Sequence, residues 1–235
     1  MFIDSRTVVV CVPAATAVDD LADVAGARLA ALGLTPVGPV DHFVTQPGPA
    51  PRRFIRRQRR PAPALTFGGP ICQLDLAGMR HAAAAHAADL WQLWQHVVAK
   101  TPPARPYWTF EDRHHEDPDR WPLARAEQAY TSQPRYQAMA VYNAAVHPAH
   151  QLSTEHLEAF QAGADAYTRL AALAAVPADA VATVPADAVA VASGPPGWFT
   201  PTSARLNDLV EYLRLANRLL DSLPPNVRLA ALTAS

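Results

Sequence analysis

The run TVVVCV, residues 7–12, decides the fold class of this chain. It joins four valines to a threonine and a cysteine, and such a β-branched run is typical of a strand buried on both faces. Residues 16–34 follow with apolar side chains at helical spacing. We expect Thr16 to cap this helix at its start and Gly33 to end it. A buried strand followed by a helix predicts a small α/β layer at the N-terminus.

Outward from this layer, the pattern changes from strand to helix. Short strands are expected over 36–45, 64–69 and 71–76. Helices are expected over 76–100, 108–116, 122–132, 134–146 and 154–175, and an amphipathic helix is expected over 203–222. The predicted fold class is α+β and helix-dominated, with a small N-terminal α/β layer over 1–76 followed by a multi-helix region over 77–235.

An exact duplication interrupts the helical region. The heptapeptide VPADAVA occupies 176–182 and recurs at 184–190. Two copies of this length are too short to build a solenoid. We interpret 176–197 as a Pro/Ala/Val repeat linker, with an ordered pair of turns as the alternative.

Composition limits the classes of protein that the chain can represent. Half of the residues are apolar and 17% are charged, so the chain can bury a core. The net charge of −1 produces no overall attraction to nucleic acid or to a membrane, so any such attraction must be local. Nineteen arginines stand beside one lysine, Lys100, which indicates a GC-rich genome. Codon bias does not, however, explain clustering of the arginines.

The expected compartment is the cytoplasm. The N-terminus has an acid at Asp4 and only a short apolar run, which does not fit a signal peptide. No apolar run is long enough for a membrane span. Cys11 and Cys72 lack the CxxC spacing, and we expect both to be buried free thiols in strands.

The strongest functional signal is an arginine cluster in the connection 46–64. Prolines flank the cluster on both sides, and no acid occurs between Asp41 and Asp75. An arm of this kind favours an anionic partner, either nucleic acid or another polyanion. The alternative is a solvated loop that keeps the protein soluble. The predicted binding residues are Arg52, Arg53, Phe54, Arg56, Arg57, Arg59 and Arg60, with Phe54 available for stacking on a base.

A second candidate is the stretch WTFEDRHHEDPDRW at 108–121. Glu111 and His114 are spaced i, i+3, which is half of a carboxylate-bridged metal motif, and no second copy occurs in the sequence. The alternative hypothesis is therefore a metal-dependent hydrolase that uses Glu111, His114, His115 and His86. The preferred interpretation assigns no metal. It treats 111–119 as the solvated end of a helix followed by turn residues, with Trp108, Phe110 and Trp121 as anchors.

Linear signatures of catalysis are otherwise absent. The sequence has no Walker loop, no dinucleotide-binding glycine motif, no nucleophile elbow and no HExxH motif. We expect no cofactor, and the balance favours a non-catalytic binding or regulatory protein over an enzyme. A third hypothesis is a structural or assembly subunit, in which the last helix or the Trp91–Trp94 region contacts another chain. The sequence predicts no oligomeric state.

Overall fold

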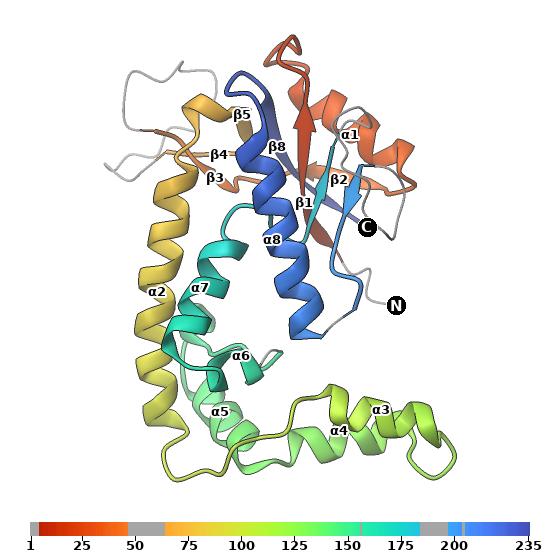
Figure 1. Cartoon of the computed structure of the whole chain (residues 1–235), viewed down its shortest axis with the longest axis vertical. Helices are drawn as coiled ribbons and strands as arrows, with labels where there is room; N and C mark the ends of the chain where they lie inside the picture. The colour runs from red at the N-terminus through yellow and green to blue at the C-terminus, as the bar shows by residue number, and fades with distance from the viewer. Residues whose placement is uncertain (1–4, 47–63, 156, 184–196, 204) are drawn as a thin grey trace. The chain divides into compact units, whose positions relative to one another are not determined.

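The computed structural model describes residues 5–46, 64–155, 157–183, 197–203 and 205–235. The chain divides into two compact units. The α/β unit contains Met1–Ala82 and Ala172–Ser235, and the helical unit contains Ala83–Ala171. The division does not follow a single cut near residue 76, because the C-terminal segments return to the unit that the N-terminal strand begins (Figure 1).

The predicted strand is the centre of a mixed sheet. β1 (Arg6–Val12) pairs antiparallel with β8 (Arg228–Ala234) along its whole length, and parallel with β6 (Ala180–Ala182) on its other side. The strand order is β2–β8–β1–β6–β7, and β5 also pairs with β8. The bounds of the outer strands are Pro36–Pro39 for β2, Gly68–Pro70 for β5 and Trp198–Phe199 for β7. This central position explains why β1 is an uninterrupted apolar run.

Helix α1 (Leu21–Ala31) covers one face of the sheet. It connects β1 to β2, which both run antiparallel to the intervening β8, so the three elements form a split βαβ unit. Its side chains Leu21, Ala25 and Leu29 are fully buried. They share a core cluster with the alternate residues of the strands: Val8, Val10, Val12, Ala180, Ala182, Ala230, Leu232 and Ala234.

The remaining strand residues face the opposite side, where Figure 1 shows α8 (Leu206–Ser222) lying along the sheet. Helix α8 is held by polar contacts as well as by its apolar residues. The buried Asn217 donates to the carbonyl oxygens of Leu173 and Leu213, both at 2.8 Å, and accepts from Nε of Arg80 at 3.1 Å. Arg80 also pairs with Asp221 at 2.8 Å. This network satisfies the polar atoms of the Asn217 side chain.

The helical unit contains α3 (Trp108–Glu116), α4 (Leu123–Thr131), α5 (Pro134–Ala145), α6 (Leu157–Gln161) and most of α2 (Leu76–Val97) and α7 (Ala164–Ala174). Two apolar clusters stabilise it. One gathers Trp94, Val98, Ala104, Met139, Leu152, Leu157 and Phe160. The other gathers Phe110, Ala126 and Tyr130, with Trp121 packed against them. Trp108, which we expected to be an anchor, is 39% exposed.

The predicted fold class is confirmed. Helices account for 51% of the described residues and stand beside a mixed sheet. Within the described residues, no helix is long and apolar enough to cross a membrane.

Several boundaries differ from prediction for identifiable reasons. Helix α1 begins at Leu21, because residues 13–20 form turns in which Thr16 N–H donates to the Pro13 carbonyl. The stretch 71–73 is a 3-10 turn that leaves Cys72 exposed, whereas Cys11 is buried as expected. The predicted helix 154–175 is broken at Gly163, whose φ of +104° is a left-handed conformation. The first copy of the repeat contributes β6, and the second copy, 184–190, lies outside the described residues.

The pairing of β5 with β8 leads to a test of strand packing. A Cβ atom built on Gly68 would lie 2.9 Å from the Cα of Ala230, whereas one on Gly38 of β2 would meet nothing within 4 Å. We expect Gly68→Ala to lower the free energy of unfolding by about 1–3 kcal/mol, because β5 must move away from β8. Gly38→Ala, the matched control, should change it by less than about 1 kcal/mol. Urea denaturation measures both, and equal effects would contradict the close approach of these strands.

Candidate functional site

The connection that carries the arginine cluster begins and ends at a small hairpin. β3 (Phe43–Val44) and β4 (Leu65–Thr66) pair antiparallel, with Phe43 opposite Thr66 and Val44 opposite Leu65. Beyond them, the N–H of Thr45 donates to the carbonyl of Ala64 at 3.0 Å. The two ends of the connection are therefore adjacent.

The rest of the α/β unit fixes the base of this hairpin. Phe43 is fully buried, and Thr45 forms an isolated bridge with Leu74. The N–H of Gln46 donates to the carbonyl of Gln73 at 2.9 Å, and the ring Nε2 of His42 lies 3.0 Å from the carbonyl oxygen of Val176. Bonds to two separate segments, residues 73–74 and Val176, hold the hairpin, so residues 46 and 64 are fixed where the connection leaves it and returns.

The predicted binding residues themselves, Arg52, Arg53, Phe54, Arg56, Arg57, Arg59 and Arg60, lie outside the described residues. The prediction that they bind an anionic partner stays a prediction. The described residues show only where the segment that carries them is attached, at Gln46 and Ala64.

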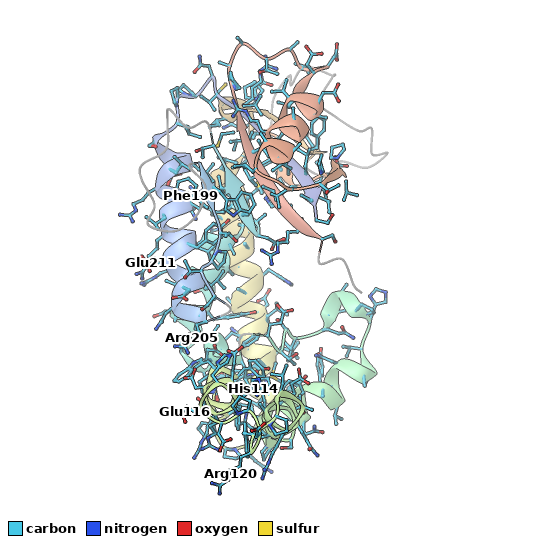
Figure 2. The ribbon with its side chains drawn as sticks, turned by 90° about the vertical axis from the view of Figure 1, so that its right-hand side faces the viewer. His114, Glu116, Arg120, Phe199, Arg205 and Glu211 are labelled. Carbon is cyan, nitrogen blue, oxygen red and sulfur yellow. The ribbon has the colours of Figure 1, made fainter. Side chains whose placement is uncertain are left out.

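The histidine–carboxylate stretch forms the end of α3 and the turn after it, as the preferred interpretation expected. Figure 2 shows His114 and Glu116 on α3 and Arg120 beyond its end. Asp117 organises the turn, because its carboxylate accepts from the N–H of Arg120 at 3.1 Å and its carbonyl accepts from the N–H of Trp121 at 2.9 Å. Nδ1 of His114 lies 3.0 Å from the carbonyl oxygen of Trp121.

The metal alternative receives no support from the described residues. Among them, no group of three or more His, Cys, Asp or Glu side chains gathers closely enough to hold a metal ion. Helical spacing puts His86 on one apolar stripe with Leu90 and Trp94 and so predicts a buried histidine. The structure shows that His86 is exposed on α2 and that its neighbour Ala87 is buried, so this prediction was wrong at that position. Glu111, His114 and His115 lie together on α3 without a further ligand from another described element.

Aromatic and cationic side chains interact along the same turn. The guanidinium carbon of Arg125 lies 4.4 Å from the centre of the Trp121 ring, and that of Arg113 lies 5.6 Å from it. Both distances are within the range of cation–π contacts. Arg113 and Arg125 thus contribute to stabilising the turn.

A hollow in the helical unit was not anticipated from the sequence. Its volume is about 400 Å³, and its walls come from the end of α2, the start of α5, and α6. We call it the Arg135 hollow, and the lining residues that matter below are Trp91, Trp94, Lys100, Arg135, Phe160 and Gln161. The sequence features that relate to this hollow are Pro134, which starts a helix, and Arg135, which follows it. These features do not show which aromatic side chains lie near the arginine, so they could not predict the hollow.

Arg135 is held in this hollow by neutral partners. Its Nε donates to the hydroxyl of Thr101 at 3.2 Å, one terminal nitrogen donates to the Thr101 carbonyl at 2.9 Å, and the other donates to Oε1 of Gln161 at 2.7 Å. The guanidinium carbon lies 5.3 Å from the centre of the Trp94 ring. Burial lowers the pKa of Arg135 below its ordinary value, which is the direction expected for a cation that loses water.

Comparison of the chain with protein-family models, with curated proteins and with solved structures finds no match. The fold defines the class as an α+β protein with a mixed sheet and a separate helical unit. The assignment of a function therefore rests on the chemistry of this chain's own residues.

The contact of His42 at the hairpin base predicts a pH dependence of stability. Burial is the largest cause of a lowered pKa for His42, relative to the ordinary 6.5, and it outweighs the opposing effects of the Val176 carbonyl and Asp179. The folded state therefore disfavours protonation. The resulting stability is fully present above pH 6.5 and is lost as the pH falls through the lowered folded pKa.

Urea midpoints measured at about pH 7.5 and about pH 5 test this dependence. We expect the midpoint to fall between the two pH values in the unmodified chain and to fall less in His42→Gln. The exposed His81 of the same unit provides the control, because His81→Gln should keep the full decrease. An unchanged decrease in His42→Gln would show that other groups cause it.

Proposed function

We propose that this chain is a cytoplasmic, non-catalytic binding or regulatory protein that engages a nucleic acid, or another polyanion, through the arginine-rich connection. One observation carries the proposal. Six arginines occur within nine residues, no acid lies between Asp41 and Asp75, and the segment leaves a hairpin that is bonded to the rest of its unit. Such a cluster creates a local positive field in a chain whose net charge is close to zero.

The chemistry of the cluster favours phosphates over other anions. Each guanidinium presents a planar fork that matches phosphate oxygens, and evenly spaced phosphates allow several forks to bind at once. Phe54, within the cluster, provides a ring on which an unpaired base can stack. A single small anion would use only one or two of the six charges.

The hairpin base supports this assignment by limiting where the charges act. The connection 47–63 has seventeen residues, and both of its ends are attached at adjacent positions. A chain of this length reaches at most about 30 Å from its base even when it is fully extended. All six charges therefore act within a short distance of one point, which raises their effective concentration toward a single partner.

The two alternatives receive less support. The metal-dependent hydrolase has no ligand group among the described residues. For an assembly subunit, the exposed face would have to come from α8 or from Trp91 and Trp94. The inward-facing residues of α8 are buried within their own unit, namely Tyr212, Leu213, Ala216, Asn217, Leu219 and Leu220. Trp94 is only 5% exposed. No contact among the described residues favours either alternative.

The dependence of binding on salt tests the proposal. Six neutralised phosphates of duplex DNA predict a slope near −5 in a plot of log K against log salt. Fluorescence anisotropy with a labelled duplex at several salt concentrations measures this slope. Replacing all six arginines by glutamine should abolish it, because the counterions that they displace are then no longer released. Absence of binding at low salt, or an unchanged slope in the variant, would sink the proposal.

Two triple variants that remove the same charge distinguish a specific role of the arginine-rich connection from a general effect of net charge. Arg52→Gln, Arg53→Gln and Arg56→Gln together should reduce the slope to about −2.7. The control triple, Arg120→Gln, Arg214→Gln and Arg218→Gln, removes the same charge from exposed positions elsewhere and should keep a slope near −5. Equal reductions would indicate a general charge effect. If labelled heparin binds directly and neither duplex nor single-stranded DNA does, the nucleic-acid form of the proposal fails and the partner is another polyanion.

A further inference from the structure

Arg135 is a partly buried cation that no carboxylate of the described residues neutralises. Glu158 stands on the same helix as Gln161, and it forms no ion pair with Arg135. Burial is the cause behind the lowered pKa of Arg135, with no acidic neighbour contributing. Arginines at such sites are usually paired with an acid, because removing a charge from water is costly. The described residues of its own unit therefore supply no acidic partner for Arg135.

The guanidinium keeps donors free for that group. Arginine has five N–H donors, and three of those on Arg135 are used by Thr101 and Gln161. The two that remain belong one to each terminal nitrogen, so both nitrogens can still donate to an oxyanion. Gln161 is itself fixed, since it exchanges hydrogen bonds with the backbone of Ala104 at 2.8 and 2.9 Å. The fork is consequently preorganised.

The hollow beside this fork has an aromatic wall. The rings of Trp94 and Phe160 stack with centroids 5.4 Å apart and an angle of 17° between their planes. Trp91 donates its indole N–H to the carbonyl of Phe160 at 2.9 Å, which fixes the wall further. The indole nitrogen of Trp94 is buried and has no partner among the described residues. Trp94 and Phe160 are only 5% and 1% exposed, whereas Trp91 is half-buried, so Trp91 is the ring of the lining that an apolar or planar molecule can contact.

A second cation lines the hollow. Lys100 follows α2 and has a φ of +68°, the left-handed conformation that glycine or asparagine usually occupies at a helix end. A lysine at this position costs backbone strain and adds a positive charge near Arg135. Among the hollow's lining residues, Lys100 and Arg135 are cationic and none is acidic.

We propose that the Arg135 hollow binds a small organic oxyanion, a carboxylate or phosphate attached to a planar apolar group. The oxyanion pairs with the terminal nitrogens of Arg135 and with Lys100, and the apolar group lies against the half-buried ring of Trp91. A volume of about 400 Å³ fits this class of ligand and excludes a polymer. The site uses none of the residues of the arginine-rich connection, so it does not depend on the nucleic-acid proposal.

Titration of the full-length chain with simple probes tests the site. Phenylacetate and phenyl phosphate represent the two oxyanions, and phenylacetamide is the neutral control of the same shape. Two-dimensional NMR of the indole N–H groups follows the titration, with the Trp94 signal assigned by Trp94→Phe. We expect the Trp91 or Trp94 signal to shift saturably with at least one anion and with a dissociation constant at or below about 10 mM. The stronger of the two anions identifies the class.

Variants assign the charge to its residue. Arg135→Gln should weaken binding of the preferred probe about tenfold or more, and Arg135→Lys should recover part of that loss. Arg120→Gln, an exposed arginine of the same unit that does not line the hollow, should stay within about twofold. Thermal unfolding verifies that each variant is folded.

Lys100→Asn gives a second measurement that does not disturb the hydrogen bonds of Arg135. Asparagine tolerates the left-handed backbone, and we expect binding to weaken about threefold through the lost charge. The proposal is overturned if neither anion shifts an indole signal at tens of millimolar, roughly the weakest binding that still counts as specific. It is also overturned if phenylacetamide binds as well as the anions, or if both Arg135→Lys and Lys100→Asn bind as the unmodified chain does.

Discussion

The antiparallel pairing of β1 with β8 is the constraint on which the α/β unit depends. It joins Arg6 to Ala234 and Val12 to Arg228 through seven residue pairs, so the first and last strands of the chain are neighbours at the centre of one sheet. Every segment between them must leave the sheet and return to it. Contacts that are so distant in sequence form only after a costly loop closure, which predicts slow folding relative to a helical protein of this size. It also explains why α8 and the C-terminal strand belong to the unit that the N-terminus begins.

Half of this central pairing could be predicted from the sequence. β1 was identified because a valine run has no helical periodicity and no polar face. β8 was not predicted, because its residues, RLAALTA, are rich in alanine and leucine, a composition that fits a helix as well as a strand. The strand forms there because its neighbours on both sides supply hydrogen bonds, and Leu229, Ala230 and Ala231 become fully buried. Pairing of this kind overrides local propensity and has no local signal.

The two candidate sites also differ in how far the sequence could predict them. The arginine-rich connection is visible in the sequence, since charge clustering is a property of neighbouring residues, and its attachment to β3 and β4 is consistent with a long loop between strands. The Arg135 hollow is not visible, because Trp94, Arg135 and Gln161 come from three helices and meet only in the folded unit. His86 illustrates the limit of periodicity: a shift of one position along α2 separates an exposed histidine from the buried Ala87.

Electrostatics determine how the two sites can coexist in one chain. The net charge is −1 and the connection contributes six positive charges, so the remaining residues together carry −7. A polyanion is therefore attracted by the connection and repelled by the average surface elsewhere, which favours binding at one place over binding in many orientations. At physiological salt, charges separated by more than about 8 Å are largely screened, so this discrimination acts at close range. Binding at the Arg135 hollow depends less on salt, because its cation is partly buried and weakly screened. A small oxyanion there is favoured by the loss of water around Arg135, whereas the connection depends on the number of charges that it presents together.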